Sequence, residues 1–167
     1  MKTPELRAAR LATRSHFFIC GLLFASWGVH VPTVKQQYGL SEAELATLML
    51  ASSLGALIGL TRVGAWVARH GTRPVVRVAG FVLALSLALL LVMPGYPALA
   101  ALLFVFGLAT GSFDVAMNAE AVAVERAWGR PIMSSFHGFF SLGGLAGAGL
   151  GSLVALCEVP PLLHLIL

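Results

Sequence analysis

Apolar residues run in long blocks along this chain, and charged residues are confined to the short segments between the blocks. No Asp, Glu, Lys or Arg occurs in residues 15–34, 45–61, 78–113 or 131–157. A helix needs about 20 mostly apolar residues to cross the hydrocarbon core of a bilayer. The block at 78–113 is too long for one such helix, and the Pro-Gly-Tyr-Pro segment at 94–97 divides it in two. The pattern therefore predicts membrane-spanning helices.

The predicted fold is an all-α integral membrane bundle of five transmembrane helices and the start of a sixth. The expected helices cover residues 15–34, 42–66, 74–93, 97–125 and 131–157, and the Pro-Pro pair at 160–161 opens the sixth apolar stretch. Ser41 and Glu44 have the S-x-x-E spacing of a capping box, which marks the start of the second helix. We divide the chain into a basic cytoplasmic tail at 1–14 and a transmembrane bundle at 15–167.

The distribution of cations predicts the orientation of the bundle. They fall in the N-terminal tail and in the connections between the second and third and the fourth and fifth helices. These cations are Lys2, Arg7, Arg10, Arg14, Arg62, Arg69, Arg73, Arg77, Arg126 and Arg130, whereas Lys35 lies at the other end. Basic loops favour the cytoplasmic side, so we expect a multi-pass inner (plasma) membrane protein with a cytoplasmic N-terminus. The net charge of +4 thus follows from topology, and no nucleic-acid partner is expected.

One acid lies inside the apolar region of the fourth expected helix. Asp114 belongs to a stripe of small and polar residues, namely Gly107, Gly111, Asp114, Asn118, Ala121 and Glu125. An acid at the centre of a bilayer costs about 2.5–3.5 kcal/mol on insertion scales, so the stripe should face other helices or a water-filled cavity. Burial favours the protonated carboxyl. Asp114 therefore either exchanges protons with the two sides in turn or fixes packing through a hydrogen bond.

The fifth expected helix is rich in small residues. Gly143, Gly147 and Gly151 recur every four residues, and a second small row lies beside them. Small residues at this spacing let transmembrane helices approach closely. His137, near the start of this helix, is either a hydrogen-bonding group of the helix start or a proton relay. Glu120, off the stripe of the fourth helix, is interpreted as an interfacial residue.

The sequence shows no arrangement of residues typical of an enzyme. It contains no C-x-x-C, H-E-x-x-H, G-x-S-x-G or P-loop motif. We expect no enzymatic activity, no cofactor and no metal site.

Two segments resemble a known family. The connection GAWVARHGTR at 64–73 resembles the loop signature of the major facilitator superfamily, roughly G-x-x-x-D-R-x-G-x-[KR]; Gly64, Arg69, Gly71 and Arg73 match, whereas Ala68 replaces the acid. The segment 114–148 closely resembles bacterial inner-membrane facilitators related to fucose permease. The resemblance covers about residues 14–167. It implies the N-terminal half of a transporter whose two halves rock about a central site.

The resemblance also implies functional residues. Fucose:proton symporters carry an acid on helix 4 followed four residues later by Asn, and Asp114 and Asn118 stand at those positions. The acid that these symporters carry late in helix 1 is replaced here by Gly28. Trp27 and His30 are further candidates for binding solute or protons, and Trp27 either stacks on a sugar ring or anchors the helix at the interface. A cytoplasmic gate would comprise Arg69, Gly71, Arg73, Glu125, Arg126 and Arg130, of which the last three are otherwise a solvated loop cluster.

A faint internal repeat relates the first and fourth expected helices. FFICGLLFASWG at 17–28 aligns without gaps to LFVFGLATGSFD at 103–114, which places Gly28 opposite Asp114. The two helices run in opposite directions according to the cations. Inverted repeats of this kind place substrate sites near the midplane of the bilayer.

These observations predict secondary active transport of a small polar, sugar-like solute by alternating access, coupled to protons if Asp114 exchanges them. The alternative is a non-transporting membrane scaffold or assembly subunit held by the glycine rows. The expected partners are the lipid bilayer, the solute, protons, and a missing C-terminal half or a second chain. Among a truncated reading frame, a half that pairs with another chain and a degenerate remnant, we favour truncation, and we expect the chain alone not to transport.

Overall fold

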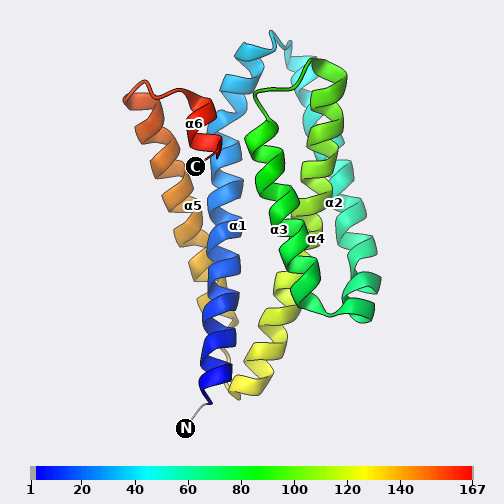
Figure 1. The fold of residues 1–167 in the computed structure, drawn as a ribbon, viewed down its shortest axis with the longest axis vertical. Coiled ribbons are helices and arrows are strands. Elements are labelled where there is room, and N and C mark those ends of the chain that lie inside the picture. Colours follow the sequence, from blue (N-terminus) through cyan, green and yellow to red (C-terminus); the bar gives the residue numbers. More distant parts are fainter. Residues whose placement is uncertain (1–2, 167) are drawn as a thin grey trace.

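The computed structural model describes residues 3–166, which form a bundle of antiparallel helices along one long axis (Figure 1). Expectations about Lys2 and Leu167 lie outside the described residues. The helices are α1 (Pro4–Gln37), α2 (Glu42–His70), α3 (Thr72–Leu89), α4 (Tyr96–Trp128), α5 (Met133–Leu156) and α6 (Pro161–Ile166). The first five are long and apolar enough to cross a membrane. The predicted all-α fold of five spans and the start of a sixth is confirmed.

Helix α1 begins well before its expected start at residue 15. Thr3 caps the helix, because its hydroxyl accepts a hydrogen bond from the backbone N–H of Leu6 at 3.3 Å. Pro4 occupies the first turn, where its missing N–H costs nothing. The sequence-based boundary at residue 14 therefore lies inside a continuous helix.

The other helix ends are set by capping groups and glycines. The capping box at the start of α2 is confirmed, since Ser41 and Glu44 each accept a hydrogen bond from the backbone N–H of the other. Helix α2 continues to His70, beyond the expected end at residue 66, and stops at Gly71, whose φ of +80° few other residues adopt. Helix α4 likewise runs to Trp128 and stops at Gly129, whose φ is +72°.

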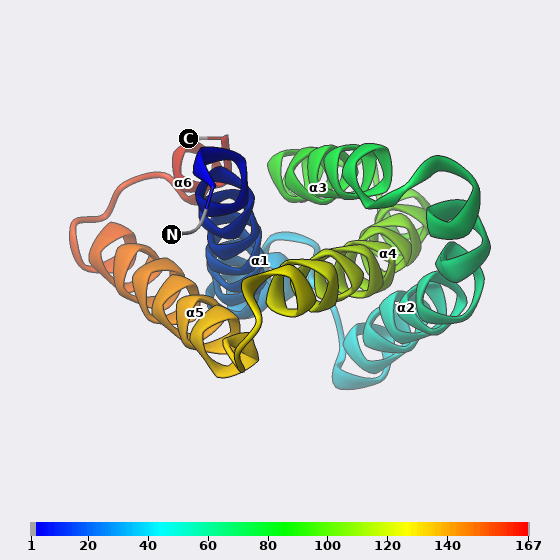
Figure 2. The same cartoon turned by 90° about the horizontal axis from the view of Figure 1, so that it is seen from below.

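The helices form two closely packed pairs. Helix α1 packs along α5 and α2 packs along α4, while α1 and α4 touch each other less extensively. Seen along the bundle, α3 covers α4, and α6 lies beside α1 on the same side as α3 (Figure 2). Helices α1 and α4 therefore lie at the centre, flanked by α5 and α2.

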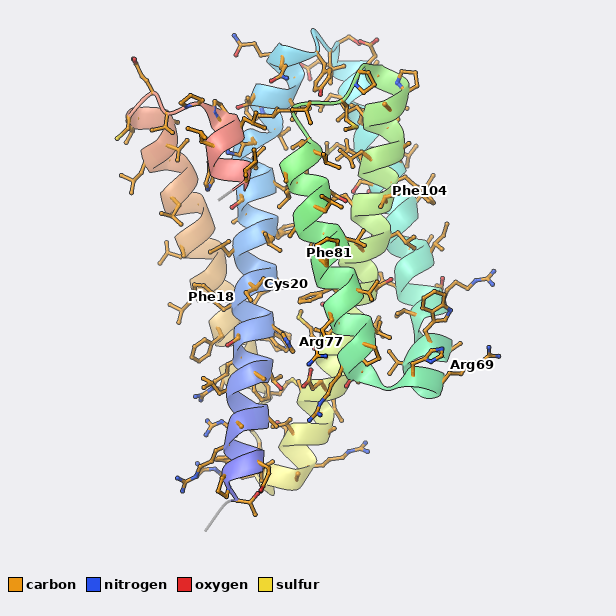
Figure 3. All side chains as sticks on the ribbon, viewed as in Figure 1. Phe18, Cys20, Arg69, Arg77, Phe81 and Phe104 are labelled. Atoms are coloured by element: carbon orange, nitrogen blue, oxygen red, sulfur yellow. The ribbon has the colours of Figure 1, made fainter. Side chains whose placement is uncertain are left out.

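Backbone-to-backbone contact at glycines holds both pairs together. A Cβ atom added at Gly143 would clash with the carbonyl oxygen of Phe18, and one added at Gly55 would clash with that of Phe104. Phe18 on α1 and Phe104 on α4 are labelled in Figure 3. The small rows of α5 thus have the packing role predicted for them, and glycines of α2 have the same role.

The same contacts confirm the internal repeat. In the alignment of 17–28 with 103–114, Phe18 falls on Phe104 and Gly21 falls on Gly107. Added Cβ atoms at these two glycines would meet equivalent atoms, the carbonyl oxygens of Phe140 on α5 and of Ser52 on α2. The pair α1–α5 is therefore the structural counterpart of the pair α4–α2.

Candidate functional site

Asp114 and Asn118 form a hydrogen-bonded unit on α4. The Nδ2 of Asn118 donates to Oδ1 of Asp114 at 3.1 Å and to the backbone carbonyl of Asp114 at 2.9 Å. Both residues are partly exposed. Asn118 therefore holds the carboxylate in one position and leaves its second oxygen free for another donor.

Two further helices reach this carboxylate. His137 of α5 and Cys20 of α1 both lie near the Asp114 carboxyl. The His137 ring packs edge-on against Phe17 of α1, with 5.2 Å between ring centroids. The acid therefore lies where α1, α4 and α5 meet, and His137 has a place beside it that sequence reasoning had left open.

A second titratable pair joins α1 and α4 nearer the N-terminal end of the bundle. His16 Nδ1 lies 3.2 Å from Oε2 of Glu120, with 26% and 12% of the side chains exposed. The distance is that of an ion pair, although the angle does not make a hydrogen bond. The Glu120 carboxyl thus faces α1, and its position at the membrane interface stays a prediction. Sequence reasoning missed His16 because its partner lies on another helix. The available signal was that each of the two is a titratable residue on an apolar helix.

Trp27 and His30 lie in the core of the bundle. Trp27 is 7% exposed and packs on Phe106 of α4, with ring centroids 5.7 Å apart. His30 is 3% exposed, and its Nε2 lies 2.7 Å from Nδ1 of His164 on α6. Within residues 3–166 neither ring has a hydrogen bond or ring contact with Asp114 or Asn118. Of the four solute-binding candidates, Asp114 and Asn118 are thus in contact with each other. Trp27 and His30 have other partners.

The six residues suggested for a gate lie in two connections at the same end of the bundle. Gly71 forms the tight turn between α2 and α3, Arg69 lies in the last turn of α2 and Arg73 in the first turn of α3; Figure 3 shows Arg69 pointing away from the bundle. In the other connection, the Oε2 atom of Glu125 accepts hydrogen bonds from the backbone N–H groups of Ile132 (2.7 Å) and Met133 (2.6 Å). Glu125 therefore caps α5. Across the described chain, no ion pair links the two connections.

The start of α1 is held against the connection between α4 and α5. The guanidinium of Arg10 lies 4.4 Å from the ring centroid of Trp128, a cation–π geometry. Arg14 donates to Ser135 Oγ at 3.0 Å and lies 5.0 Å from the ring of Phe139. These contacts explain why the basic residues expected in a tail continue the helix instead.

The site and the fold together define a class of protein. Five apolar spans with an inverted internal repeat surround a polar unit at the junction of the central helices, as in the helical halves of membrane transporters.

The chain belongs to the Major Facilitator Superfamily, whose family model matches residues 15–157. Over 140 residues it is 46% identical to an uncharacterized MFS-type transporter of Yersinia pestis, covering 84% of this chain and 36% of that protein. It is 36% identical over 148 residues to the uncharacterized transporter y4wD of Sinorhizobium fredii (strain NBRC 101917 / NGR234), covering 89% of this chain and 39% of the relative.

A third relative, the membrane protein MosC of Rhizobium meliloti, is 34% identical over 144 residues, which is 86% of this chain and 35% of MosC. The chain thus spans little more than a third of the length of these curated relatives. No solved structure matches it. Membership of a transporter family supports a role in membrane transport and a multi-pass membrane location.

Proposed function

We propose that this chain supplies the central helices of a secondary transporter that moves a small polar, sugar-like solute by alternating access, with Asp114 as the proton-binding group. The observation that carries the proposal is the position of this acid, partly exposed at the junction of α1, α4 and α5. Acids within membrane spans mark ion and substrate pathways. Asn118 positions the carboxylate, and its second oxygen is available to a proton or a solute hydroxyl.

The geometry suits a group that changes its charge during transport. A carboxylate surrounded by helices is costly to keep ionised. His137 lies beside this carboxyl. Binding of a proton to Asp114 removes the charge from the junction, so the state that encloses the acid becomes more favourable than the state that opens it to water.

The proposal also includes a partner for the exposed helices. Helices α2 and α5 pack mainly on α4 and α1, and each keeps most of its surface exposed. The relatives are much longer than this chain. Transport by alternating access then requires a second helical bundle, in the same chain or in another, that closes the central helices from the other side. The cationic end, which includes the N-terminus, faces the cytoplasm of a cell with an inner membrane.

Two measurements test the role of Asp114. On the chain in lipid nanodiscs, infrared difference spectra taken across a pH titration should show a protonated-carboxyl band that disappears in Asp114→Asn. The control variant Glu44→Gln, which changes an exposed carboxyl in the first turn of α2, should leave that band in place. In proteoliposomes of the assembled transporter, a panel of radiolabelled monosaccharides should accumulate only when a pH gradient is imposed. Asp114→Asn should abolish accumulation while exchange of solute across the membrane continues. Unchanged accumulation in Asp114→Asn would show that the acid has no coupling role.

A second candidate function rests on the glycine contacts. Two helix pairs locked by backbone contact would also suit a membrane scaffold that transports nothing. If the assembled protein takes up no member of the solute panel, and if the carboxyl band of Asp114 does not titrate, the scaffold becomes the better account.

A further inference from the structure

A groove of the bundle lies away from Asp114, between α2, α3 and α4. It has a volume of about 460 Å³, and neither Asp114 nor Asn118 lines it. Its walls are almost entirely apolar, with side chains such as Ile58, Val78 and Leu108. Arg62 and His70 bring charge and hydrogen-bonding capacity to it at the N-terminal end of the bundle. The groove therefore combines a long apolar channel with a cationic mouth.

Among the described residues no acidic side chain lines the groove, whereas Arg62 does. Between Glu44 and Asp114 the sequence contains no Asp or Glu, whereas Arg62, Arg69, Arg73 and Arg77 all occur there. In the family signature an acid stands beside the conserved arginine, and here Ala68 occupies that position. No hydrogen bond or ion pair involves the Arg62 side chain within residues 3–166. The groove mouth is thus an unneutralised positive site.

The groove is about as long along α2 as one leaflet of a bilayer is thick, and its mouth, from Arg62 to His70, takes about 12 Å of that length. Along α2 its lining runs from Ile58 to His70, which is about 18 Å at 1.5 Å per residue. Half of a hydrocarbon core is about 15 Å. Trp66, 64% exposed, lies on the same wall about 6 Å along the helix from both Arg62 and His70. Exposed Trp residues mark the level of lipid head groups, so the cationic mouth lies at that level and the apolar part lies within the leaflet.

We propose that this groove binds an anionic phospholipid from the leaflet at the N-terminal end, with one acyl chain along the apolar wall and the phosphate at Arg62 and His70. Basic pockets between transmembrane helices on the cytoplasmic side bind anionic head groups. An anionic lipid brings net negative charge to this mouth, whereas a zwitterionic lipid also brings an ammonium group that the arginines repel. The binding site is independent of proton coupling at Asp114, since no residue is shared.

Lipid binding is measured on the full chain in nanodiscs containing either phosphatidylglycerol or phosphatidylcholine with brominated acyl chains. Bromine quenches Trp fluorescence at short range, and the Trp66→Phe variant identifies the part of the signal that comes from Trp66. We expect stronger quenching by brominated phosphatidylglycerol than by brominated phosphatidylcholine. Native mass spectrometry of the detergent-purified chain should show the same preference, with more phosphatidylglycerol than phosphatidylcholine retained.

The variant Arg62→Gln should reduce the preference for phosphatidylglycerol by about fivefold, the contribution of one arginine near an anionic lipid surface. Arg126→Gln is the matched control, because Arg126 lies at the same end of the bundle and outside the groove. Val78→Trp, which fills the groove and keeps every charge, should reduce Trp66 quenching by the lipid while leaving the fold intact by circular dichroism.

Three results would overturn the proposal. If Arg126→Gln and Arg62→Gln reduced the preference for phosphatidylglycerol equally, the lipid would be attracted to the basic surface as a whole and not to the groove. Absence of quenching by either brominated lipid would show that protein, such as a second copy or a second bundle, covers the groove. Displacement of the lipid by millimolar inorganic phosphate would show a site for free anions.

Discussion

At the scale of single residues, the polar side chains of this membrane protein are concentrated at the contacts between helices. Asn118 positions Asp114, Glu120 faces His16, and His30 faces His164. Each of these side chains would be costly in contact with lipid and is much less so when paired. Sequence reasoning identified Asp114 and Asn118 because both lie on one helix at a four-residue spacing. It could not pair His16 with Glu120, because that contact depends on how α1 and α4 lie against each other.

Glu125 shows how a charged residue near the end of a helix can have a structural role. Its carboxylate accepts the first backbone N–H groups of α5 from the preceding helix. Glu125→Gln removes the charge and one of the two good acceptor positions, so the free energy of unfolding should fall by about 1–2 kcal/mol. Thermal unfolding in mild detergent, followed by circular dichroism, measures this change.

The control for this prediction is Arg126→Gln, which changes the exposed side chain next to Glu125. Its unfolding temperature should stay close to that of the unchanged chain. If Glu125→Gln and the unchanged chain unfold at the same temperature, water replaces the carboxylate at the start of α5 without loss of stability.

At the scale of helices, the spans were predictable and their ends were less so. The charge-free blocks correctly located five helices because the bilayer leaves few alternatives to a helix of this length. The start of α1 was placed too late, because the arginines of residues 4–14 suggested a solvated tail. Thr3 and Pro4 are a recognisable helix start, but the stacking of Arg10 on Trp128 that stabilises the extension is a tertiary contact.

The glycine contacts give a prediction for the α1–α5 pair. A Cβ at Gly147 would meet the backbone of Leu22, whereas a Cβ at Gly149, two residues along the same helix, would meet nothing within 4 Å. Gly147→Ala should therefore force α1 and α5 apart and destabilise the bundle by about 1–3 kcal/mol. Gly149→Ala should change stability by no more than about 0.5 kcal/mol.

Reversible unfolding in mixed micelles compares the two variants directly. Because both replace glycine by alanine in the middle of α5, any difference reports packing and not helix propensity. Similar stability of the two variants would show that α5 does not approach α1 as closely as described.

At the scale of the whole molecule, the charges divide the bundle into two unlike ends. The described arginines all lie at the end with the N-terminus and the α2–α3 and α4–α5 connections (Figure 1). Lys35 lies at the opposite end, where it pairs with Glu42. The orientation in the cell follows from this asymmetry if basic loops remain in the cytoplasm.

Cysteine labelling in intact cells tests that orientation. After replacement of both native cysteines, Cys20 and Cys157, a single cysteine at Thr72 should resist a membrane-impermeant maleimide until the cells are opened. A single cysteine at Gln36, at the other end, should react in intact cells that have a permeable outer membrane. Reversed labelling would place the N-terminus outside the cytoplasm.

The glycine contacts described above make two stiff plates of the bundle, α1 with α5 and α2 with α4. Within each plate the backbones touch, so sliding or tilting of one helix against its mate is resisted. The looser seam between the plates runs along α1 and α4, and Asp114 and the His16–Glu120 pair lie on that seam. Any change of charge at these residues would therefore act on the contact between α1 and α4, which is less extensive than the contact within either pair.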